Sequence, residues 1–268
     1  MEEQMTEYKI DQAFLENCLV TAKRAAKSAE QIIKHYYKCS PETNIKADLT
    51  PVTQADIECE QVIKQVLEAS YPDFGFYGEE TGQSNADSDF MWLVDPIDGT
   101  KSFVREYPFF STQIALMFKG EIIVGVSHAP LFNETAWAAK DLGAFINDQP
   151  LTVSESIKPE DSCYSTGNLK SMTQDKKQWE KLRQVMSFCH KTRGYGDFYH
   201  YHLLAAGKLE LIIESDLNIL DIAALTIIVH EAGGLMTGLK GQPINLKTRS
   251  ILAGNKPSYE NALAIFNS

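Results

Sequence analysis

Apolar residues recur at helical spacing through the first quarter of the chain. Cys18 and Ile33 fall on one face of a helix that we expect over residues 12–37, and a second helix is expected over residues 53–70. The segment between them, residues 44–51, is polar and contains a proline, which predicts a loop or a hairpin. The pattern therefore indicates two long helices joined by a short irregular connection.

Short apolar runs replace this helical pattern in the middle of the chain, where we expect strands at residues 90–94, 112–118, 121–127 and 134–139. The Lys119-Gly120 pair predicts a tight hairpin between the second and third of them. After a polar stretch near residues 150–159, strands are expected at 162–166, 209–214, 234–237 and 251–253, and helices at 175–189, 198–207, 221–231 and from 258. Helix pairs, a mainly antiparallel sheet and then alternating elements predict an α+β fold of stacked layers.

Composition narrows the classes of partner. The chain has 268 residues, 44% of them hydrophobic, so it can bury a sizeable core. A net charge of −11 without any basic stripe argues against nucleic acid as a partner. No apolar run approaches the roughly 18 residues of a membrane span, and residues 1–5 do not begin a secretory signal. The cysteines are odd in number and scattered (Cys18, Cys39, Cys59, Cys163 and Cys189), which favours reduced thiols in a cytoplasmic protein.

Two carboxylates, Asp95 and Asp98, directly follow the apolar run Phe90-Met91-Trp92-Leu93-Val94, which is typical of a buried strand. Carboxylate oxygens suit Mg²⁺, which binds through one or two carboxylates together with substrate phosphate oxygens. If Gly99 and Thr100 open a helical turn, their backbone N–H groups would face a phosphate. The same Asp-Pro-x-Asp-Gly sequence is also compatible with an ordinary turn.

Further acidic residues lie near the ends of other predicted elements. Glu79 follows a short apolar run at residues 74–77, Asp56 lies at the start of the second helix, and Asp221 lies in the first turn of a late helix. Each also has a purely structural explanation. Glu79 could lie in a solvated acidic loop, Asp56 could form a capping box with Thr53, and Asp221 could interact with the dipole of its helix. If the strand ends share one edge of the sheet, these carboxylates would meet there.

Taken together, these motifs resemble the inositol monophosphatase family. They are Thr53-x-x-Asp56, Gly78-Glu79-Glu80, Asp95-Pro96-Ile97-Asp98-Gly99-Thr100 and Leu220-Asp221-Ile222-Ala223-Ala224, in the order that the family has them. The resemblance runs from the first helix to about Asn255 and implies a Mg²⁺-dependent, lithium-sensitive phosphomonoesterase with an αβαβα layered fold. It also implies a homodimer whose protomer is one compact catalytic unit. Residues 1–150 would carry most metal ligands, and residues 151–268 would carry Asp221 and the substrate-specificity residues.

The resemblance further implies a role for each residue of these motifs. Two to three Mg²⁺ ions would be held by Glu79, Asp95, the Ile97 carbonyl, Asp98 and Asp221. Asp95 would be shared between the two main ions, and Asp56, Glu79 and Thr100 would be catalytic. Asp56 would lie near the attacking water and a weaker third ion, with Thr100 orienting that water. The amides of Gly99 and Thr100 would hold the phosphate.

Substrate choice is predicted from the second half of the chain. The segments Gly196-Asp197-Phe198-Tyr199 and Lys101-Ser102-Phe103 resemble the histidinol-phosphate phosphatase branch of the family. Histidinol phosphate carries an ammonium group, and we expect Asp197 and Glu214 to line the alcohol side of the site, beside Asp221, and to pair with that group. From the residues alone, Asp197 could instead cap its helix, and Glu214 could be an exposed residue at a strand end. The predicted reaction is hydrolysis of L-histidinol phosphate, a step of histidine biosynthesis.

Other functions remain open at this point. Inositol 1-phosphate is the second candidate substrate. Adenosine 3′,5′-bisphosphate and fructose 1,6-bisphosphate rank lower because a second phosphate needs added basic residues, for which Lys46, Lys191 and Arg193 are the nearby candidates. A non-catalytic binder on the same fold would be favoured by the loss of a metal carboxylate, yet the sequence retains all of those named above.

Overall fold

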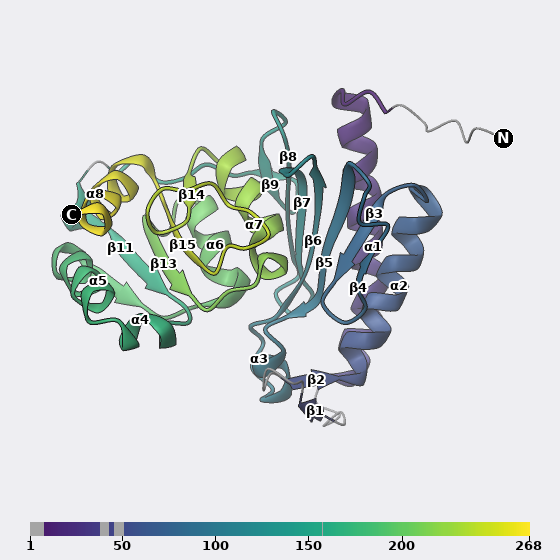
Figure 1. Cartoon of the computed structure of the whole chain (residues 1–268), viewed down its shortest axis with the longest axis horizontal. Coiled ribbons are helices and arrows are strands. Elements are labelled where there is room, and N and C mark those ends of the chain that lie inside the picture. The colour runs from purple at the N-terminus through teal and green to yellow at the C-terminus, as the bar shows by residue number, and fades with distance from the viewer. Residues whose placement is uncertain (1–7, 38–42, 46–50, 157) are drawn as a thin grey trace.

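The computed structural model describes residues 8–37, 43–45, 51–156 and 158–268 of the chain. Figure 1 shows its elements stacked as a helix layer, a sheet, a second helix layer, a second sheet and a third helix layer. This is the αβαβα order expected from the sequence. Within the described residues, no helix combines the length and the apolar character needed to cross a bilayer. Cys39 and Lys46 lie outside the described residues.

The first layer is the helix pair α1 (Gln12–Tyr36) and α2 (Gln54–Ser70). Asp11 caps α1 by accepting a hydrogen bond from the Phe14 N–H at 3.0 Å, and the face that contains Cys18 and Ile33 is fully buried. Both helices pack against one face of the larger sheet (Figure 1). The two helices predicted from apolar spacing are therefore confirmed. The short hairpin of β1 (Thr43–Ile45) and β2 (Pro51–Thr53) precedes α2.

The larger sheet has eight strands in the order β10-β9-β8-β7-β6-β5-β3-β4, all antiparallel except for the β3–β5 pair. They are β3 (Gly75–Gly78), β4 (Gly82–Ser84), β5 (Phe90–Asp98), β6 (Ser111–Phe118), β7 (Glu121–Ala129), β8 (Glu134–Ala139), β9 (Ala144–Ile146) and β10 (Gln149–Pro150). The β6–β7 hairpin turns at Lys119-Gly120, where φ is +49° and +87°. That turn is confirmed, because it places two left-handed residues between twisted strands.

A β-bulge near the end of β5 decides where its two carboxylates point. Asp95 pairs with Gln113 and Asp98 pairs with Ser111, so three steps along β5 match two steps along β6. In a regular strand, residues three apart point to opposite faces of a sheet. The extra residue in the bulge brings Asp95 and Asp98 to the same face. The strand therefore continues past Val94, where the apolar run ends, and the ordinary-turn interpretation of this segment is wrong.

The middle layer consists of α6 (Asp197–Ala205) and α7 (Ile219–Glu231), which lie between the two sheets (Figure 1). Helix α7 is buried along nearly its whole length. It approaches β7 so closely that a Cβ on Gly125 would lie 2.5 Å from the Ala224 carbonyl oxygen. The start of α7, and with it Asp221, is thus held against the larger sheet.

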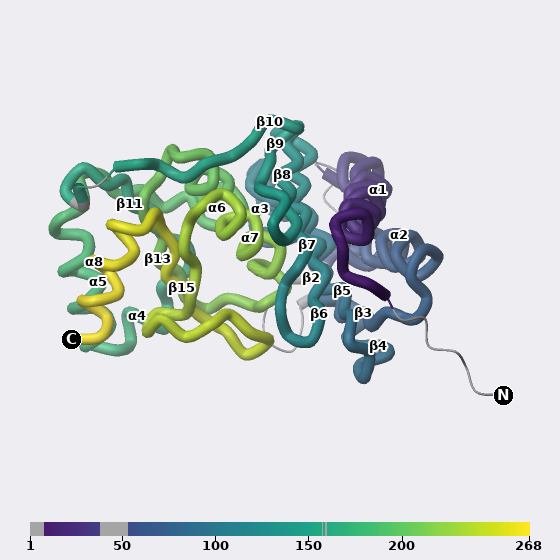
Figure 2. Tube along the Cα trace, turned by 90° about the horizontal axis from the view of Figure 1, so that it is seen from above, coloured from purple at the N-terminus to yellow at the C-terminus, as the bar shows by residue number. Residues whose placement is uncertain are grey.

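The smaller sheet has five strands in the order β12-β11-β13-β15-β14. They are β11 (Cys163–Thr166), β12 (Lys191–Arg193), β13 (Leu211–Ser215), β14 (Leu235–Thr237) and β15 (Ser250–Gly254). The helices α4 (Lys170–Gln174), α5 (Lys176–Phe188) and α8 (Lys256–Asn267) form the last layer (Figure 1). After β10 the chain crosses from the larger to the smaller sheet, as Figure 2 shows. The Asn255 side chain holds this crossing by donating to the carbonyls of Ser154 at 3.0 Å and Ser156 at 2.9 Å.

Candidate active site

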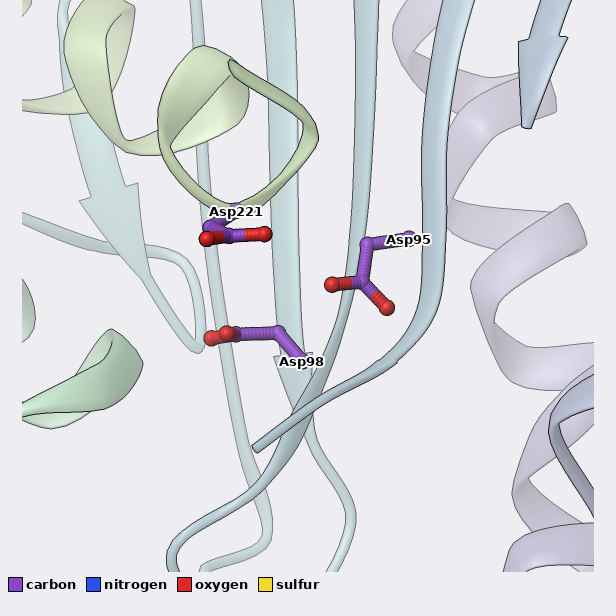
Figure 3. A group of neighbouring side chains, drawn as sticks. All are labelled: Asp95, Asp98 and Asp221. Carbon is purple, nitrogen blue, oxygen red and sulfur yellow. The ribbon is translucent and has the colours of Figure 1, made fainter. Parts of the chain in front are cut away.

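Three carboxylates from two elements meet between the larger sheet and α7. Asp95 and Asp98 come from the bulged end of β5, and Asp221 comes from the first turn of α7 (Figure 3). One oxygen of each lies within 4.8 Å of the others. Asp221 also accepts a hydrogen bond from the Asn218 N–H at 2.8 Å, which completes a capping box and fixes its orientation. Asp221 therefore has the helix-start role, and the same carboxylate lies close to Asp95 and Asp98.

Burial and mutual repulsion make ionisation of this cluster costly without a cation. Burial, followed by the charges of Glu79 and Asp98, raises the pKa of Asp95 well above its usual range. The pKa of Asp98 is raised in the same way, by burial and then by the charges of Asp197 and Asp221. Burial raises the pKa of Asp221 to about 7. Such a cluster favours either protonation or a bound cation.

The donor set fits a magnesium ion. All three clustered side chains offer hard carboxylate oxygens, the ligand type that Mg²⁺ prefers. Asp98 Oδ2 is buried and has no hydrogen-bond partner in the described part of the chain, which is costly for a carboxylate oxygen unless a cation contacts it. The Ile97 N–H donates to Asp95 Oδ1 at 3.0 Å, which fixes the orientation of this carboxylate.

Glu79 and Asp56 come from two further parts of the chain, the turn after β3 and the start of α2. Glu79 directly follows β3, and its N–H donates to the Val94 carbonyl at 3.2 Å. The Asp56 carboxylate accepts hydrogen bonds from the Thr53 N–H at 2.7 Å and the Thr53 hydroxyl at 2.6 Å. Its second oxygen lies 3.3 Å from the Thr100 hydroxyl. The predicted capping box is therefore present, and the same carboxylate also reaches the segment that carries the other predicted site residues.

A cavity of about 410 Å³ opens above these carboxylates. It is lined by Glu79, Asp95, Asp98, Gly99, Thr100, Lys101, Ser102, Asn168, Asp197, Asp216, Leu217, Asn218, Asp221 and Arg249. Gly99 adopts a left-handed φ of +91° where α3 (Thr100–Val104) begins, and a Cβ there would lie 2.6 Å from the Phe109 carbonyl oxygen. Only glycine permits this sharp entry into α3 so close to neighbouring backbone.

Two basic side chains of the cavity were not assigned a role from the sequence. Lys101 directly follows the central hexapeptide, so proximity in sequence could have identified it. Arg249 precedes β15, far from every motif, and no sequence signal points to it. Lys191 and Arg193, the sequence candidates for binding a second phosphate, form the edge strand β12 and do not line the cavity.

Asp197 and Glu214 occupy different positions in the site. Asp197 lines the cavity, and burial, followed by the charge of Glu214, raises its pKa to about 6. Glu214 is 2% exposed, so it is not the exposed strand-end residue of the structural alternative. It accepts hydrogen bonds from the Tyr201 hydroxyl at 2.9 Å and the Asn168 N–H at 3.1 Å. Glu214 is absent from the cavity lining, so the expectation that it lines the alcohol side needs correction: its hydrogen bonds hold it behind the wall, next to Asp197.

Comparison with known proteins gives a consistent picture. The family model described as "Inositol monophosphatase family" matches residues 15–267. A histidinol-phosphatase of Mycobacterium tuberculosis is 38% identical over 201 residues, covering 73% of this chain and 77% of that protein. A histidinol-phosphatase of Chlorobaculum parvum is 30% identical over 240 residues, covering 90% of this chain and 92% of that protein.

A solved structure agrees with the fold. An inositol monophosphatase from Zymomonas mobilis superimposes with a TM-score of 0.84 at 29% identity, covering 94% of this chain and 98% of that chain. The fold class predicted from the sequence is thereby confirmed.

The raised pKa of Asp221 predicts how the metal-free protein responds to pH. In the folded state Asp221 keeps its proton up to a pKa of about 7, whereas a carboxylate in an unfolded chain loses it near 4. The folded state therefore binds more protons in this window, and stability falls as pH rises through it. In EDTA at pH 8, Asp221→Asn should melt at least about 2 °C above wild type, with the gap closing toward pH 4.

The matched control is Asp175→Asn. Asp175 also accepts backbone N–H groups at a helix start, but it is exposed, and the hydrogen bond from the Gln178 N–H and then that from Lys177 lower its pKa. Removing its charge should not stabilise the protein at pH 8. An Asp221→Asn variant that melts at or below wild type across the whole pH range would contradict the electrostatic account of the cluster.

Proposed function

The chain belongs to the inositol monophosphatase family of phosphatases, and from this premise we propose that it hydrolyses L-histidinol phosphate to L-histidinol and phosphate with the help of Mg²⁺. The observation that carries the proposal is the cluster of the buried Asp95 and Asp98 with the half-buried Asp221, in which one Asp98 oxygen has no hydrogen-bond partner among the described residues. The histidinol-phosphatases among its relatives support the choice of substrate. The reaction belongs to histidine biosynthesis, a cytoplasmic pathway.

The residues present define which groups would hold the metal ions. Glu79, Asp95 and the Ile97 carbonyl would hold one ion, and Asp95, Asp98 and Asp221 a second. When bound, Mg²⁺ supplies an acidified water and neutralises charge on the attacking and leaving oxygens of the phosphate ester. Because Asp95 serves both ions in this assignment, its charge matters more than that of any other single ligand.

The remaining catalytic work falls to Thr100 and Asp56. The Thr100 hydroxyl lies 3.3 Å from Asp56 Oδ1 and 3.1 Å from the Ile97 carbonyl oxygen, so its single proton is directed toward these acceptors. Its lone pairs are then free to accept a hydrogen bond from the attacking water and to orient it. Glu79 would contact the same water from the opposite side of the cavity. The Gly99 and Thr100 amides would bind the phosphate.

Asp197 is the candidate partner of the substrate ammonium group. Burial and then the charge of Glu214 raise the pKa of Asp197, and the charges of His200 and Lys101 only partly oppose this. Among the described residues, no Lys or Arg forms an ion pair with either carboxylate. A cationic group placed in the cavity beside Asp197 would offset the repulsion between the two. Inositol 1-phosphate lacks such a group, which ranks inositol monophosphatase activity second. Bisphosphate substrates rank third, with Lys101 and Arg249 as the basic residues available to them.

The two halves, residues 1–150 and 151–268, form one catalytic unit in this proposal. The apolar cluster around α7 draws on both halves, since it joins Leu93 and Ala115 of the larger sheet to Ile212 of the smaller one. A small phosphorylated substrate is the expected partner, and neither nucleic acid nor a membrane is required.

Phosphate release tests the metal assignment. Wild-type protein should release phosphate from histidinol phosphate in Mg²⁺ and stop doing so when EDTA is added. Asp95→Asn should lower kcat by about three orders of magnitude, because it removes charge where both ions would bind. Circular dichroism should confirm that the variant is folded, and Asp175→Asn should retain wild-type activity. Chelator-resistant turnover, or near-normal activity of Asp95→Asn, would contradict the assignment.

Substrate preference tests the role of Asp197. A buried charge-assisted contact contributes about 1.5–3 kcal/mol, or roughly 10- to 150-fold in kcat/KM if it persists in the transition state. Asp197→Asn should lower kcat/KM for histidinol phosphate by such a factor and leave that for inositol 1-phosphate nearly unchanged. If wild-type protein hydrolyses inositol 1-phosphate with the higher kcat/KM, inositol monophosphatase activity becomes the better description.

A homodimer is the expected assembly. Of the apolar side chains that the sequence places next to strand ends, Phe109, Phe110 and Phe132, Phe110 is fully buried. Phe109 and Phe132 form a half-buried ring cluster with Tyr199, with centroid distances of 5.7 Å for Phe109–Phe132 and 5.1 Å for Phe132–Tyr199. Partly exposed aromatic side chains are enriched in protein interfaces. Light scattering at micromolar concentration should give twice the 30.0 kDa chain mass, and a monomer would refute the expectation.

A further inference from the structure

Glu60 is a fully buried carboxylate that the mechanism above does not use. It lies on α2, one helical turn after Asp56, and points at the turn that follows β3. Its Oε2 accepts a hydrogen bond from the Glu80 N–H at 2.8 Å, and its Oε1 accepts one from the Thr81 N–H at 2.7 Å. Among the described residues, no Lys or Arg forms an ion pair with it, so these two N–H groups are its main support.

The turn that Glu60 binds is the one that carries Glu79. The Glu79 N–H is already held by the Val94 carbonyl on β5, and Glu60 takes the next two N–H groups. Gly78 packs directly against the Glu60 carboxylate, since a Cβ at position 78 would lie 2.5 Å from Glu60 Cδ. The backbone is therefore clamped on both sides of Glu79, whose charge acts on Asp95.

Helix α2 thus reaches the site at two points. Asp56 contacts Thr100, and Glu60, four residues later on the same helix face, fixes the Glu79 turn. A rigid helix that supports both segments limits how far the Glu79 carboxylate can move relative to Asp95. Groups that orient a metal ligand from outside the coordination sphere commonly change metal affinity when they are lost.

We propose that Glu60 is a positioning residue that holds the Glu79 turn by its two backbone hydrogen bonds and thereby sets the affinity of the site for Mg²⁺. The proposal rests on the proposed function, because it assumes that Glu79 binds the metal. Glu60 itself contacts neither metal nor substrate. Its effect is expected in metal binding, with little change in catalysis once the metal is saturating.

The test compares Glu60→Gln with a matched variant, Glu210→Gln. Gln is isosteric with Glu but presents an NH₂ group to one of the two N–H donors, so one hydrogen bond is replaced by a repulsion. Glu210 is also buried and accepts a backbone N–H, from Cys163 at 2.7 Å, but it precedes β13 at the opposite end from Glu214. Both variants should lose thermal stability in EDTA.

Metal binding distinguishes positioning from mere structural support. Titration calorimetry of Mg²⁺ into the metal-free protein should give a Kd about 10- to 100-fold weaker for Glu60→Gln and unchanged for Glu210→Gln. The Mg²⁺ concentration for half-maximal phosphate release should rise by a similar factor in Glu60→Gln, with kcat at saturating Mg²⁺ close to wild type.

The outcomes separate cleanly. A wild-type Kd in a folded Glu60→Gln variant would overturn the positioning role. If Glu60→Gln does not fold, Glu60→Asp, which keeps the charge but retracts it by one methylene, should fold and weaken Mg²⁺ binding; a wild-type Kd there would likewise overturn the proposal. Failure of wild-type protein to bind Mg²⁺ would instead refute the proposed function itself.

Discussion

Repulsion between buried carboxylates is the constraint on which the rest of this molecule depends. A one-residue bulge in β5 brings Asp95 and Asp98 to the same face, where α7 adds Asp221. Burial first, and then the charges of neighbouring carboxylates, raise the pKa of Asp95 and of Asp98, so ionising the cluster without a cation would destabilise the folded state. The surrounding structure therefore has to hold the cluster in place against this repulsion. Close packing of α7 on β7, at Gly125, is one way in which it does so.

Among the described residues, hydrogen bonds from backbone N–H groups and from the Thr53 hydroxyl orient these carboxylates, in place of ion pairs with basic side chains. Asp221 is held by the Asn218 N–H, Asp95 by the Ile97 N–H, and Asp56 by Thr53. Each of these bonds orients an acid without neutralising it, so the negative charge of the cluster remains available to a cation. A lysine inside the cluster would stabilise the metal-free protein more, but it would weaken the binding of a metal ion. The same logic applies to Glu60, which two backbone N–H groups hold and which forms no ion pair with a Lys or Arg of the described residues.

The sequence predicted the elements that have strong periodicity and the acids that lie in motifs. Helices α1 and α2 and the Lys119-Gly120 turn follow from apolar spacing and turn chemistry, which act locally. Strands β4, β9 and β10 were not predicted, because two or three residues carry no measurable alternation. The bulge in β5 was also missed: it is a property of pairing with β6, which no local pattern encodes.

The residues that line the cavity also show that a local sequence pattern does not predict long-range pairing. Arg249 reaches the cavity only because β15 pairs with β13 and brings the preceding loop toward α7, a long-range consequence of the fold. Glu214 was expected to line the site, but it is buried and does not line the cavity. Its Tyr201 and Asn168 partners, which draw it behind the wall, come from separate elements. The sequence identified the acidic residues that lie in motifs, and tertiary pairing determined which charged residues line the cavity.

Two separate groups of negative charge follow from this arrangement, and they call for different cations. The cluster of Asp95, Asp98 and Asp221 offers several hard oxygens within one small volume, which suits a compact divalent ion. Asp197 offers a single carboxylate on the cavity wall with Glu214 behind it, which suits an ammonium group with few acceptors around it. A substrate with a phosphate at one end and an ammonium at the other satisfies both groups at once. Under the proposed function, the cluster would therefore act on the phosphate end and Asp197 on the ammonium end, and the two together would select the substrate.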